Sequence, residues 1–324
     1  MQNFKTTLTT LSISAIAMMA AVAFSGAAQA KFPDRTIHIV VPWKAGGGTD
    51  TIARGFQKGF DAAAGQTAVI DNVNGAKSIT GTLKVSKAKA DGYTLLLNGS
   101  LDTTSNLAMK KLPYTLDSFK YIGGFYLTPT WFLTNVKRPY KDFGDFLKAA
   151  KANPGKLTMG TAGSTHTLVS HAIKGATGLD FKIVPFSGGA DLKKAMIGDD
   201  IDIGQFHAPV MLNEIKAGLI RPLAATQSMQ GISYAPAKTL KTLVEYGIDL
   251  SLAGTRGLMV PKSTPDAIVA KLEAIAKKAA LSDSFASFGK TFGFAPVWVS
   301  GKDYKKQLHD ELVTLSAIKA KYIK

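Results

Sequence analysis

Residues 41–50 read VPWKAGGGTD, in which an apolar segment ends at a proline and three glycines precede a Thr-Asp pair. Glycine loses more conformational freedom on folding than any other residue, so a triplet indicates that backbone without side chains is needed there. Before it, Thr36–Pro42 predicts a strand. After it, apolar residues recur at a spacing of four from Ile52 to Phe60, as on one face of a helix. The segment therefore predicts a strand, a glycine loop that a ligand approaches, and a helix.

A loop of this kind has a chemical use. The start of a helix leaves four backbone N–H groups without internal partners and carries a partial positive charge. Glycines just before it let a ligand reach those donors, which makes a cradle for phosphate or carboxylate groups. In open α/β sheets such loops lie at the carboxyl ends of strands, where ligands bind.

Nucleotide-binding and hydrolase motifs are absent from the sequence. The glycine triplet lacks the GxGxxG spacing because residue 51 is threonine, and Lys77-Ser78 follows Gly75-Ala76, so it does not complete GxxxxGK[ST]. No GxSxG nucleophile motif occurs. We therefore expect no cofactor and no catalytic activity.

Apolar β-branched segments alternate with helical patterns along the chain, which predicts an α/β fold with parallel strands and helices on both faces of the sheet. The pattern restarts near Leu157, and the length supports two lobes better than one core. Further predicted strands are Thr67–Asn72, Tyr93–Leu97, Leu157–Gly160, Lys182–Pro185 and Ile201–Ile203, and the predicted C-terminal helices cover about 265–280 and 303–320.

An internal similarity links the two halves. Val184-Pro185-Phe186, followed by Gly188-Gly189-Ala190-Asp191, repeats the order of strand, proline, aromatic residue, glycines and helix start seen at 41–50. Chance similarity is one interpretation, because these residue pairs are common. The other is that each lobe presents a glycine loop to a shared cleft.

Three other loops after strands have the same character, at 74–78, 98–104 and 160–166. Each offers small residues, hydroxyl groups and a helix start. Ordinary N-capping by Ser, Thr and Asp would explain any one of them. Four such loops in one chain favour a binding cleft.

The N-terminus predicts export. Lys5 precedes an apolar segment from Leu11 to Phe24, and Ala28-Gln29-Ala30 fits the small-x-small pattern of signal peptidase sites. A membrane anchor is the alternative, but the apolar segment is short for a span. We therefore predict a signal peptide over 1–30, cleavage before Lys31 and a periplasmic location.

The net charge and the composition of the chain limit the kinds of binding partner that we expect. The chain has a formal net charge of +16, and this charge falls to +15 when Lys5 is removed with the signal peptide. Lysines are scattered without a basic-aromatic motif, so we expect no nucleic-acid binding, although the field attracts anions. There is no cysteine, and His166 and His171 lie five apart, which does not place two ligands on one helical face. No metal site is expected.

Four segments resemble the Bug-type (TctC-like) solute-binding proteins of tripartite tricarboxylate transporters. The resemblance extends over the whole mature chain, and the order and spacing of the segments make it specific. The segments are KFPDRTIHIVVPWKAGGGTDTIAR at 31–54, ADGYTLLLNGS at 90–100, KKLPYTLDSFKYIGGF at 110–125 and IVPFSGGADLKKAMIGDDIDIG at 183–204. The resemblance implies a two-lobed periplasmic binding protein of type II, whose chain crosses between lobes near 126–131 and 251–256. Lobe I then comprises 31–128 and 255–324, and lobe II comprises 129–254.

The resemblance also implies a function: capture of a small organic carboxylate between the lobes and its delivery to a membrane permease of the tripartite tricarboxylate type. We expect a monomer. A receptor of the same fold that presents its ligand to a sensor kinase is an alternative, and a periplasmic enzyme acting on carboxylates is a second.

The family holds carboxylates with the loop after the first strand and its counterpart in the second lobe. The sequence departs from the family at Lys44, where a small residue or proline is usual, and at 160–166, which is about two residues short. Which of Thr165, His166 and Thr167 faces inward therefore stays open. The candidate ligand-binding residues are Trp43, Ala45, Gly46, Gly47, Gly48, Thr49, Asp50, Ser78, Ser100, Asp102, Thr161, Gly163, Ser164, Thr165, His166, Phe186, Gln205 and His207.

None of the five arginines lies in these loops. A bidentate arginine is the usual strong partner of a carboxylate. We therefore expect backbone N–H groups, hydroxyls and bridging waters to hold the ligand, with Lys44 steering it from the rim. Arg256, at the second crossing, is expected to be structural.

Overall fold

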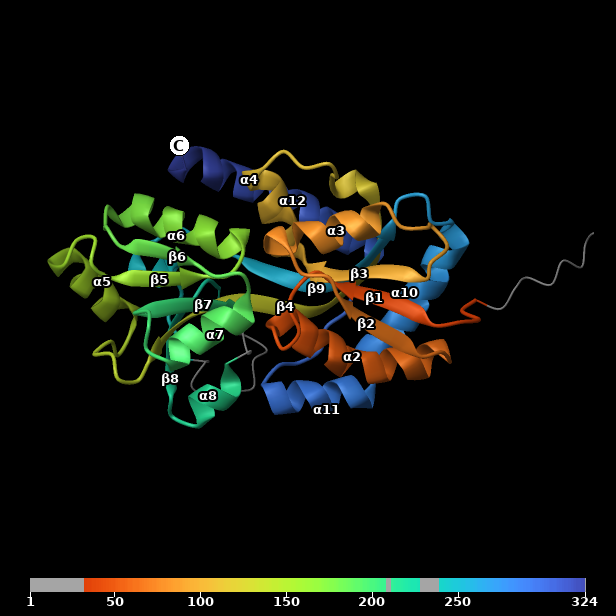
Figure 1. Cartoon of the computed structure of the whole chain (residues 1–324), viewed down its shortest axis with the longest axis horizontal. Helices are drawn as coiled ribbons and strands as arrows, with labels where there is room; N and C mark the ends of the chain where they lie inside the picture. Colours follow the sequence, from red (N-terminus) through yellow and green to blue (C-terminus); the bar gives the residue numbers. More distant parts are fainter. Residues whose placement is uncertain (1–31, 208–210, 228–238, 324) are drawn as a thin grey trace, which may run out of the picture. The chain divides into compact units, whose positions relative to one another are not determined.

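The computed structural model describes residues 32–207, 211–227 and 239–323. The predicted signal peptide over 1–30 lies outside the described residues. The unit that begins at Arg35 contains a ten-stranded mixed sheet with helices on both faces (Figure 1). The α/β fold class predicted from the sequence is confirmed.

The sheet has two parts, here called sheet A and sheet B. In sheet A the strand order is β2-β1-β3-β9-β4, with β10 added to β4. The first three strands are parallel, whereas β9 runs antiparallel to both β3 and β4. The bounds are β1 Ile37–Val41, β2 Ala68–Asn72, β3 Thr94–Gly99, β4 Phe119–Asn135, β9 Ala253–Pro261 and β10 Val299–Ser300.

In sheet B the order continues from β4 as β7-β5-β6, and β8 also pairs with β4. The strands β7, β5 and β6 are parallel to one another, and β7 is antiparallel to β4. Their bounds are β5 Thr158–Thr161, β6 Lys182–Pro185, β7 Ile203–His207 and β8 Ile220–Ala225.

Helices cover both faces of each sheet. Figure 1 shows α3, α4 and α12 over one face of sheet A and α2, α10 and α11 over the other, while α6 and α7 flank sheet B on opposite faces. The helix bounds are α2 Gly48–Ala64, α3 Ile79–Ser86, α4 Ser100–Met109, α5 Phe143–Ala152, α6 Ser164–Thr177, α7 Gly189–Ile197, α8 Leu212–Lys216, α10 Asp266–Ala280, α11 Asp283–Phe292 and α12 Gly301–Tyr322, with 3-10 turns at Ala76–Ser78, Leu116–Ser118 and Val244–Tyr246.

The regular spacing of apolar residues in the helices reflects the side chains that they bury against the sheet. Phe56 on α2 stacks on Phe125 of β4 at 4.0 Å between ring centroids, and Phe285 of α11 meets Phe56 edge-on at 5.5 Å. All three side chains are fully buried. Aromatic pairs in these geometries add to the stabilisation from buried apolar area, which fixes α2 and α11 against sheet A.

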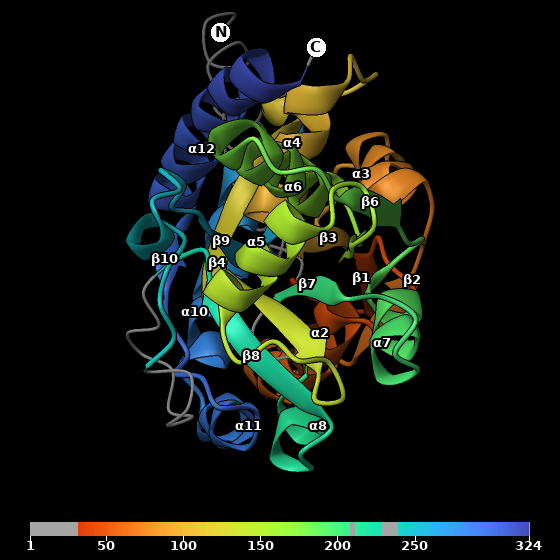
Figure 2. The same ribbon diagram turned by 90° about the vertical axis from the view of Figure 1, so that its left-hand side faces the viewer.

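The chain crosses between the sheets twice. The strand β4 pairs with β9 as far as Pro129↔Ala253 and with β7 from Thr130↔His207, so one continuous strand passes from sheet A into sheet B. On the return, the Leu252 N–H donates to Thr226 at the end of β8, and β9 begins at the next residue. Figure 2 shows β4, β8 and β9 together from the side. The predicted pair of crossings is confirmed.

One strand was predicted in the wrong place. The apolar residues of Ile201–Ile203 predict a strand there, but β7 covers Ile203–His207. Gly204 has a low intrinsic preference for strands, and the strand forms because it pairs with β4 on one side and β5 on the other.

Candidate functional site

A cleft lies between loops at the ends of strands in sheet A and sheet B. Eight of the residues predicted from the sequence line it: Trp43, Gly47, Gly48, Thr49, Asp102, His166, Gln205 and His207. Seven further lining residues were not among the candidates: Lys44, Ala162, Gly188, Gly189, Ala190, Phe206 and Arg256.

The loop after β1 brings backbone to the cleft. Gly46 has φ of +76°, which L side chains rarely adopt, so the turn requires glycine there. Gly47 is the N-cap of α2 and makes no side-chain cap, because it has no side chain. The first N–H groups of α2 therefore lie at a cleft-lining segment, with Gly47 and Gly48 leaving them accessible.

The Asp50 carboxylate stabilises this loop through hydrogen bonds. It accepts hydrogen bonds from the Gly46 N–H at 2.9 Å, from Arg54 Nε at 3.0 Å and from Asn72 Nδ2 at 3.0 Å. Burial alone would raise the pKa of Asp50, but these donors outweigh burial and lower it. Its oxygens are committed to the loop, and Asp50 is not a lining residue of the cleft.

Trp43 lines the cleft, and a residue that does not line the cleft fixes its indole ring by a hydrogen bond. Its indole Nε1 donates to Asn98 Oδ1 at 3.1 Å, and its side chain is almost fully buried. Trp43 is therefore both a buried residue and part of the cleft wall.

The second glycine loop faces the same cleft. Gly188 is the N-cap of α7, again without a side-chain cap, and Gly188, Gly189 and Ala190 line the cleft together with the α2 loop. The similarity between the two halves of the sequence thus corresponds to two helix N-termini at one cavity. This location of the second loop is the structural meaning of the repeat.

An ion pair joins the two loops. Lys44 Nζ donates to Asp191 Oδ2 at 2.8 Å and to Ser187 Oγ at 3.0 Å, so a residue of the first loop contacts the start of α7. Both side chains of the ion pair are partly exposed. The hydrogen bonds from Lys44 and Ser187 lower the pKa of Asp191. Lys44 is therefore a link across the cleft as well as a lining residue.

A buried charge pair lies deeper in the lining. Arg256 Nη1 donates to Asp102 Oδ2 at 2.9 Å, and each residue is only 3% exposed. Burial opposes ionisation of Asp102, but Arg256 and His207 outweigh it and lower the pKa of Asp102 to about 2. The pair is thus ionised and its net charge is zero. The expectation that Arg256 is only structural needs correction, because it also lines the cleft.

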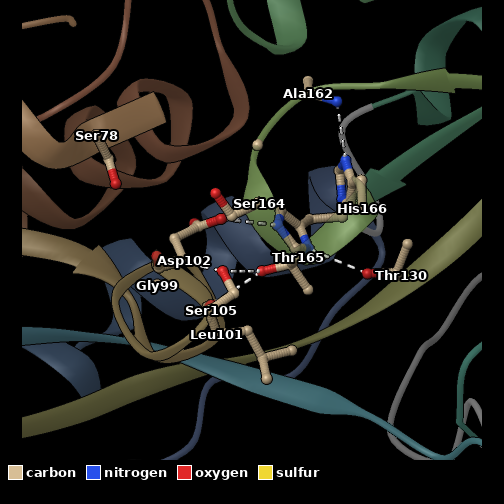
Figure 3. A network of polar contacts seen from close by, with 12 residues as sticks. Ser78, Gly99, Leu101, Asp102, Ser105, Thr130, Ala162, Ser164, Thr165 and His166 are labelled. Carbon is tan, nitrogen blue, oxygen red and sulfur yellow. Dashed lines mark hydrogen bonds and ion pairs between the residues drawn. The ribbon is translucent and has the colours of Figure 1, made fainter. Parts of the chain in front are cut away.

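Two histidines lie beside this pair, with ring centroids 4.8 Å apart. Burial lowers the pKa of His166 well below its usual range and also lowers the pKa of His207, where nearby Arg256 adds to the effect. Both imidazoles are therefore neutral near pH 7. Figure 3 shows His166 beside Ala162, whose N–H donates to His166 Nδ1 at 3.3 Å.

Asp102, His207 and Thr130 stand in the order of a hydrolase triad, but the distances are long. His207 Nε2 lies 3.7 Å from Asp102 Oδ1, and His207 Nδ1 lies 3.4 Å from Thr130 Oγ1. Thr130 is 1% exposed and does not line the cleft. A nucleophile must reach its substrate, so this arrangement does not present the Thr130 hydroxyl to a bound molecule.

The remaining candidates lie around the cleft without lining it: Ala45, Gly46, Asp50, Ser78, Ser100, Thr161, Gly163, Ser164, Thr165 and Phe186. Hydroxyl groups in this set have internal partners. Ser100 Oγ donates to Glu311 at 2.7 Å, and Ser164 Oγ donates to Asn106 at 2.6 Å. These two hydrogen bonds connect α4 to α12 and α6 to α4.

The open question of the 160–166 loop concerned Thr165, His166 and Thr167. His166 lines the cleft, whereas Thr165 Oγ1 donates to the Leu101 carbonyl at 2.9 Å and Thr167 Oγ1 to the Gly163 carbonyl at 3.0 Å. Gly163, with φ of +116°, makes the turn that allows this. A side chain there would meet Trp43 at 3.4 Å.

Two kinds of site are absent from the described residues. Within 32–207, 211–227 and 239–323, no three His, Cys, Asp or Glu side chains lie together in a way that could hold a metal ion. In the same part of the chain, no helix combines the length and apolar character that crossing a bilayer requires.

The fold and cleft together define the class: a two-lobed periplasmic binding protein of type II, with two chain crossings. Residues 52–322 match the sequence profile described as the tripartite tricarboxylate transporter family receptor, or TctC. The match covers most of the chain, and the chain belongs to this family.

Individual relatives support the same family assignment. The chain is 30% identical over 305 residues to a UPF0065 protein of Bordetella pertussis, covering 93% of each protein. A solved structure described as a periplasmic transporter superposes with a TM-score of 0.83 at 29% identity, covering 91% of this chain and 99% of that one. The R. palustris protein Rpa4515, solved with adipate, superposes with a TM-score of 0.82 at 25% identity, covering 90% and 98%.

Proposed function

We propose that this chain captures a small organic carboxylate in the cleft and delivers it, unchanged, to a membrane permease of the tripartite tricarboxylate type. It acts as a monomer in the periplasm after removal of residues 1–30. Lobe I comprises 31–128 and 255–324, and lobe II comprises 129–254. The ligand lies between them.

One observation carries the proposal: two helix N-termini, each preceded by glycine and lacking a side-chain cap, face the same cleft. Each carries unpartnered N–H groups and the positive end of a helix dipole. An anion is the ligand that can accept hydrogen bonds from both helix N-termini and interact favourably with both dipoles. Because the start of α2 and the start of α7 come from different lobes, one anion held by both favours the closed arrangement.

The charges of the cleft support an anion held mainly by neutral donors. The Arg256 guanidinium is paired with Asp102, and the Lys44 ammonium is paired with Asp191. Neither cation is therefore left to neutralise the ligand's carboxylate. The adipate held by the R. palustris relative, which shares this fold, supports a carboxylate as the ligand class.

The test begins with purified mature protein. Small molecules released on denaturation are identified by mass spectrometry, and each carboxylate found is titrated back by calorimetry. We expect one released carboxylate to bind saturably with a stoichiometry of one and to be recovered chemically unchanged. Conversion of the ligand during the titration would contradict the binding role and favour an enzyme. Release of only uncharged molecules would contradict the anion cradle.

A further inference from the structure

Three residues that line the cleft each have one buried polar atom without a hydrogen-bond partner among the described residues. These atoms are His166 Nε2, Gln205 Oε1 and Arg256 Nε. His166 and Arg256 are 3% exposed, and Gln205 is 0% exposed. Buried polar atoms are almost always paired, so three of them at one cavity indicate what a ligand must offer.

The orientation of the Gln205 amide is fixed by its nitrogen. Gln205 Nε2 donates to Ser170 Oγ at 2.6 Å and to the His166 carbonyl at 3.1 Å. A flipped amide would place oxygen against that carbonyl, where two acceptors would meet. Gln205 Oε1 is therefore an acceptor that needs a donor.

The other two atoms are donors. Because His166 Nδ1 accepts the Ala162 N–H, the proton of the neutral imidazole is on Nε2. Arg256 uses Nη1 for Asp102, and its Nε–H remains to be donated. This part of the lining, here called the polar floor, thus offers two donors and one acceptor.

We propose that the ligand carries, besides its carboxylate, a neutral group that both donates and accepts hydrogen bonds, the simplest being an alcohol hydroxyl, and that His166, Gln205 and Arg256 recognise it. The inference rests on the proposed function, since the helix N-termini hold the carboxylate. A hydroxyl donates to Gln205 Oε1 and accepts from a floor donor. The ligand is thus a hydroxy acid.

Other groups fit the polar floor less well. A second carboxylate would set its oxygens against Gln205 Oε1, and an ammonium would meet two donors, one of them on the Arg256 cation. A methylene would leave the floor atoms of a closed cleft without a partner in the ligand. A site built to bind a hydroxyl rejects the analogue that lacks it for this reason.

Matched ligands test the proposal by calorimetry. Succinate, malate and aspartate share one carbon skeleton and differ by H, OH and ammonium, and benzoate and 3-hydroxybenzoate form an aromatic pair. In at least one series the hydroxylated member should bind at least about tenfold more tightly than its deoxy counterpart. Gln205→Met, which removes the acceptor at similar volume, should reduce this ratio to about threefold or less.

Gln57→Met is the matched control. Gln57 lies on α2, its Nε2 donates to the Ala68 carbonyl at 2.7 Å, and it does not line the cleft. It should retain the wild-type ratio. Circular dichroism checks folding. If Gln205→Met does not fold, Gln205→Glu decides, because a retained acceptor with added negative charge should move the preference from malate toward aspartate.

The outcomes separate this inference from the proposed function. Equal affinity for hydroxylated and deoxy acids, or tightest binding of aspartate by the wild type, overturns the polar-floor inference while the carboxylate function stands. An unchanged ratio in folded Gln205→Met overturns the role of Gln205. Failure of every acid in both series, and of every carboxylate released from the purified protein, to bind overturns the function and the inference together.

Discussion

Gly99 determines whether the buried charge pair of the cleft can form. It ends β3 directly opposite Arg256 of β9, and α4 with Asp102 begins at the next residue. A Cβ added at Gly99 would overlap Arg256 Nη1 and lie 2.6 Å from Asp102 Oδ2. The backbone of Gly99, with φ of −77° and ψ of 140°, suits any residue. The effect of Gly99→Ala is therefore steric, and the three atoms nearest to the added Cβ all belong to the ion pair.

The magnitude follows from burial. Arg256 and Asp102 are both 3% exposed, so a guanidinium pushed off its partner finds no water to replace it. Breaking a buried ion pair costs about 3–5 kcal/mol. We expect Gly99→Ala to lower the free energy of unfolding by about this amount and to weaken ligand binding, because Arg256 lines the cleft.

Chemical denaturation of the ligand-free protein, followed by circular dichroism, measures the effect. Gly188→Ala is the stability control, because its φ of 177° is extended and an added Cβ there meets nothing within 4 Å. In an Arg256→Met background, Gly99→Ala should cost less than it does in the wild type, since its main clash is gone. A wild-type unfolding free energy for Gly99→Ala, within about 0.5 kcal/mol, would refute this reasoning.

The cleft and its surroundings lead to four further predictions. Lys44→Ala and Asp191→Asn should each weaken ligand binding by less than about tenfold, because a partly exposed pair contributes at most about 1 kcal/mol; calorimetry showing complete loss would contradict this. Gly47→Val should nearly abolish binding in the same assay, because Gly47 lines the cleft and a branched side chain there would cover the backbone that we propose the ligand contacts; retained affinity would count against the backbone cradle. Burial raises the pKa of Glu311 from 4.5 to about 7. The folded protein therefore holds that proton more tightly than the unfolded chain, and this carboxyl lowers stability by about 3 kcal/mol as the pH rises from 4.5 to 7, a slope that Glu311→Gln should remove from pH-dependent denaturation curves. Finally, N-terminal sequencing of exported protein should begin at Lys31, and retention of residue 1 would contradict cleavage.

The elements that meet at the first glycine loop could be predicted because their signals are local. The strand before the triplet was predicted as Thr36–Pro42 and is Ile37–Val41, and the helix after it begins at Gly48. The C-terminal helix predicted over 303–320 covers Gly301–Tyr322. In each case hydrophobic periodicity and glycine placement lie within a few residues of the feature that they determine.

Two members of the polar floor, His166 and Gln205, were among the candidates named from the sequence, but Arg256 was not, because it reaches the cleft only through the pairing of the sheet. Arg256 is 154 residues from Asp102 along the chain and reaches it because β3 and β9 pair with Gly99 opposite Arg256. Nothing near Arg256 in the sequence indicates a partner. A signal was available elsewhere: the glycines at 188 and 189 repeat the first loop, and this similarity pointed to the residues of the second loop that line the cleft.

The charges around the cleft are consistent with an anion site in which no cation neutralises the ligand, although the full chain carries a net charge of +16. Each cation in the lining already has an acidic partner, Asp102 for Arg256 and Asp191 for Lys44. A free buried cation would hold any anion strongly and would distinguish poorly between them. With both cations neutralised, the proposed cradle relies on N–H groups at fixed positions in the two loops, and we expect it to bind ligands that match their spacing. On this proposal the positive surface raises the rate at which anions reach the cleft, and the backbone N–H groups discriminate between them.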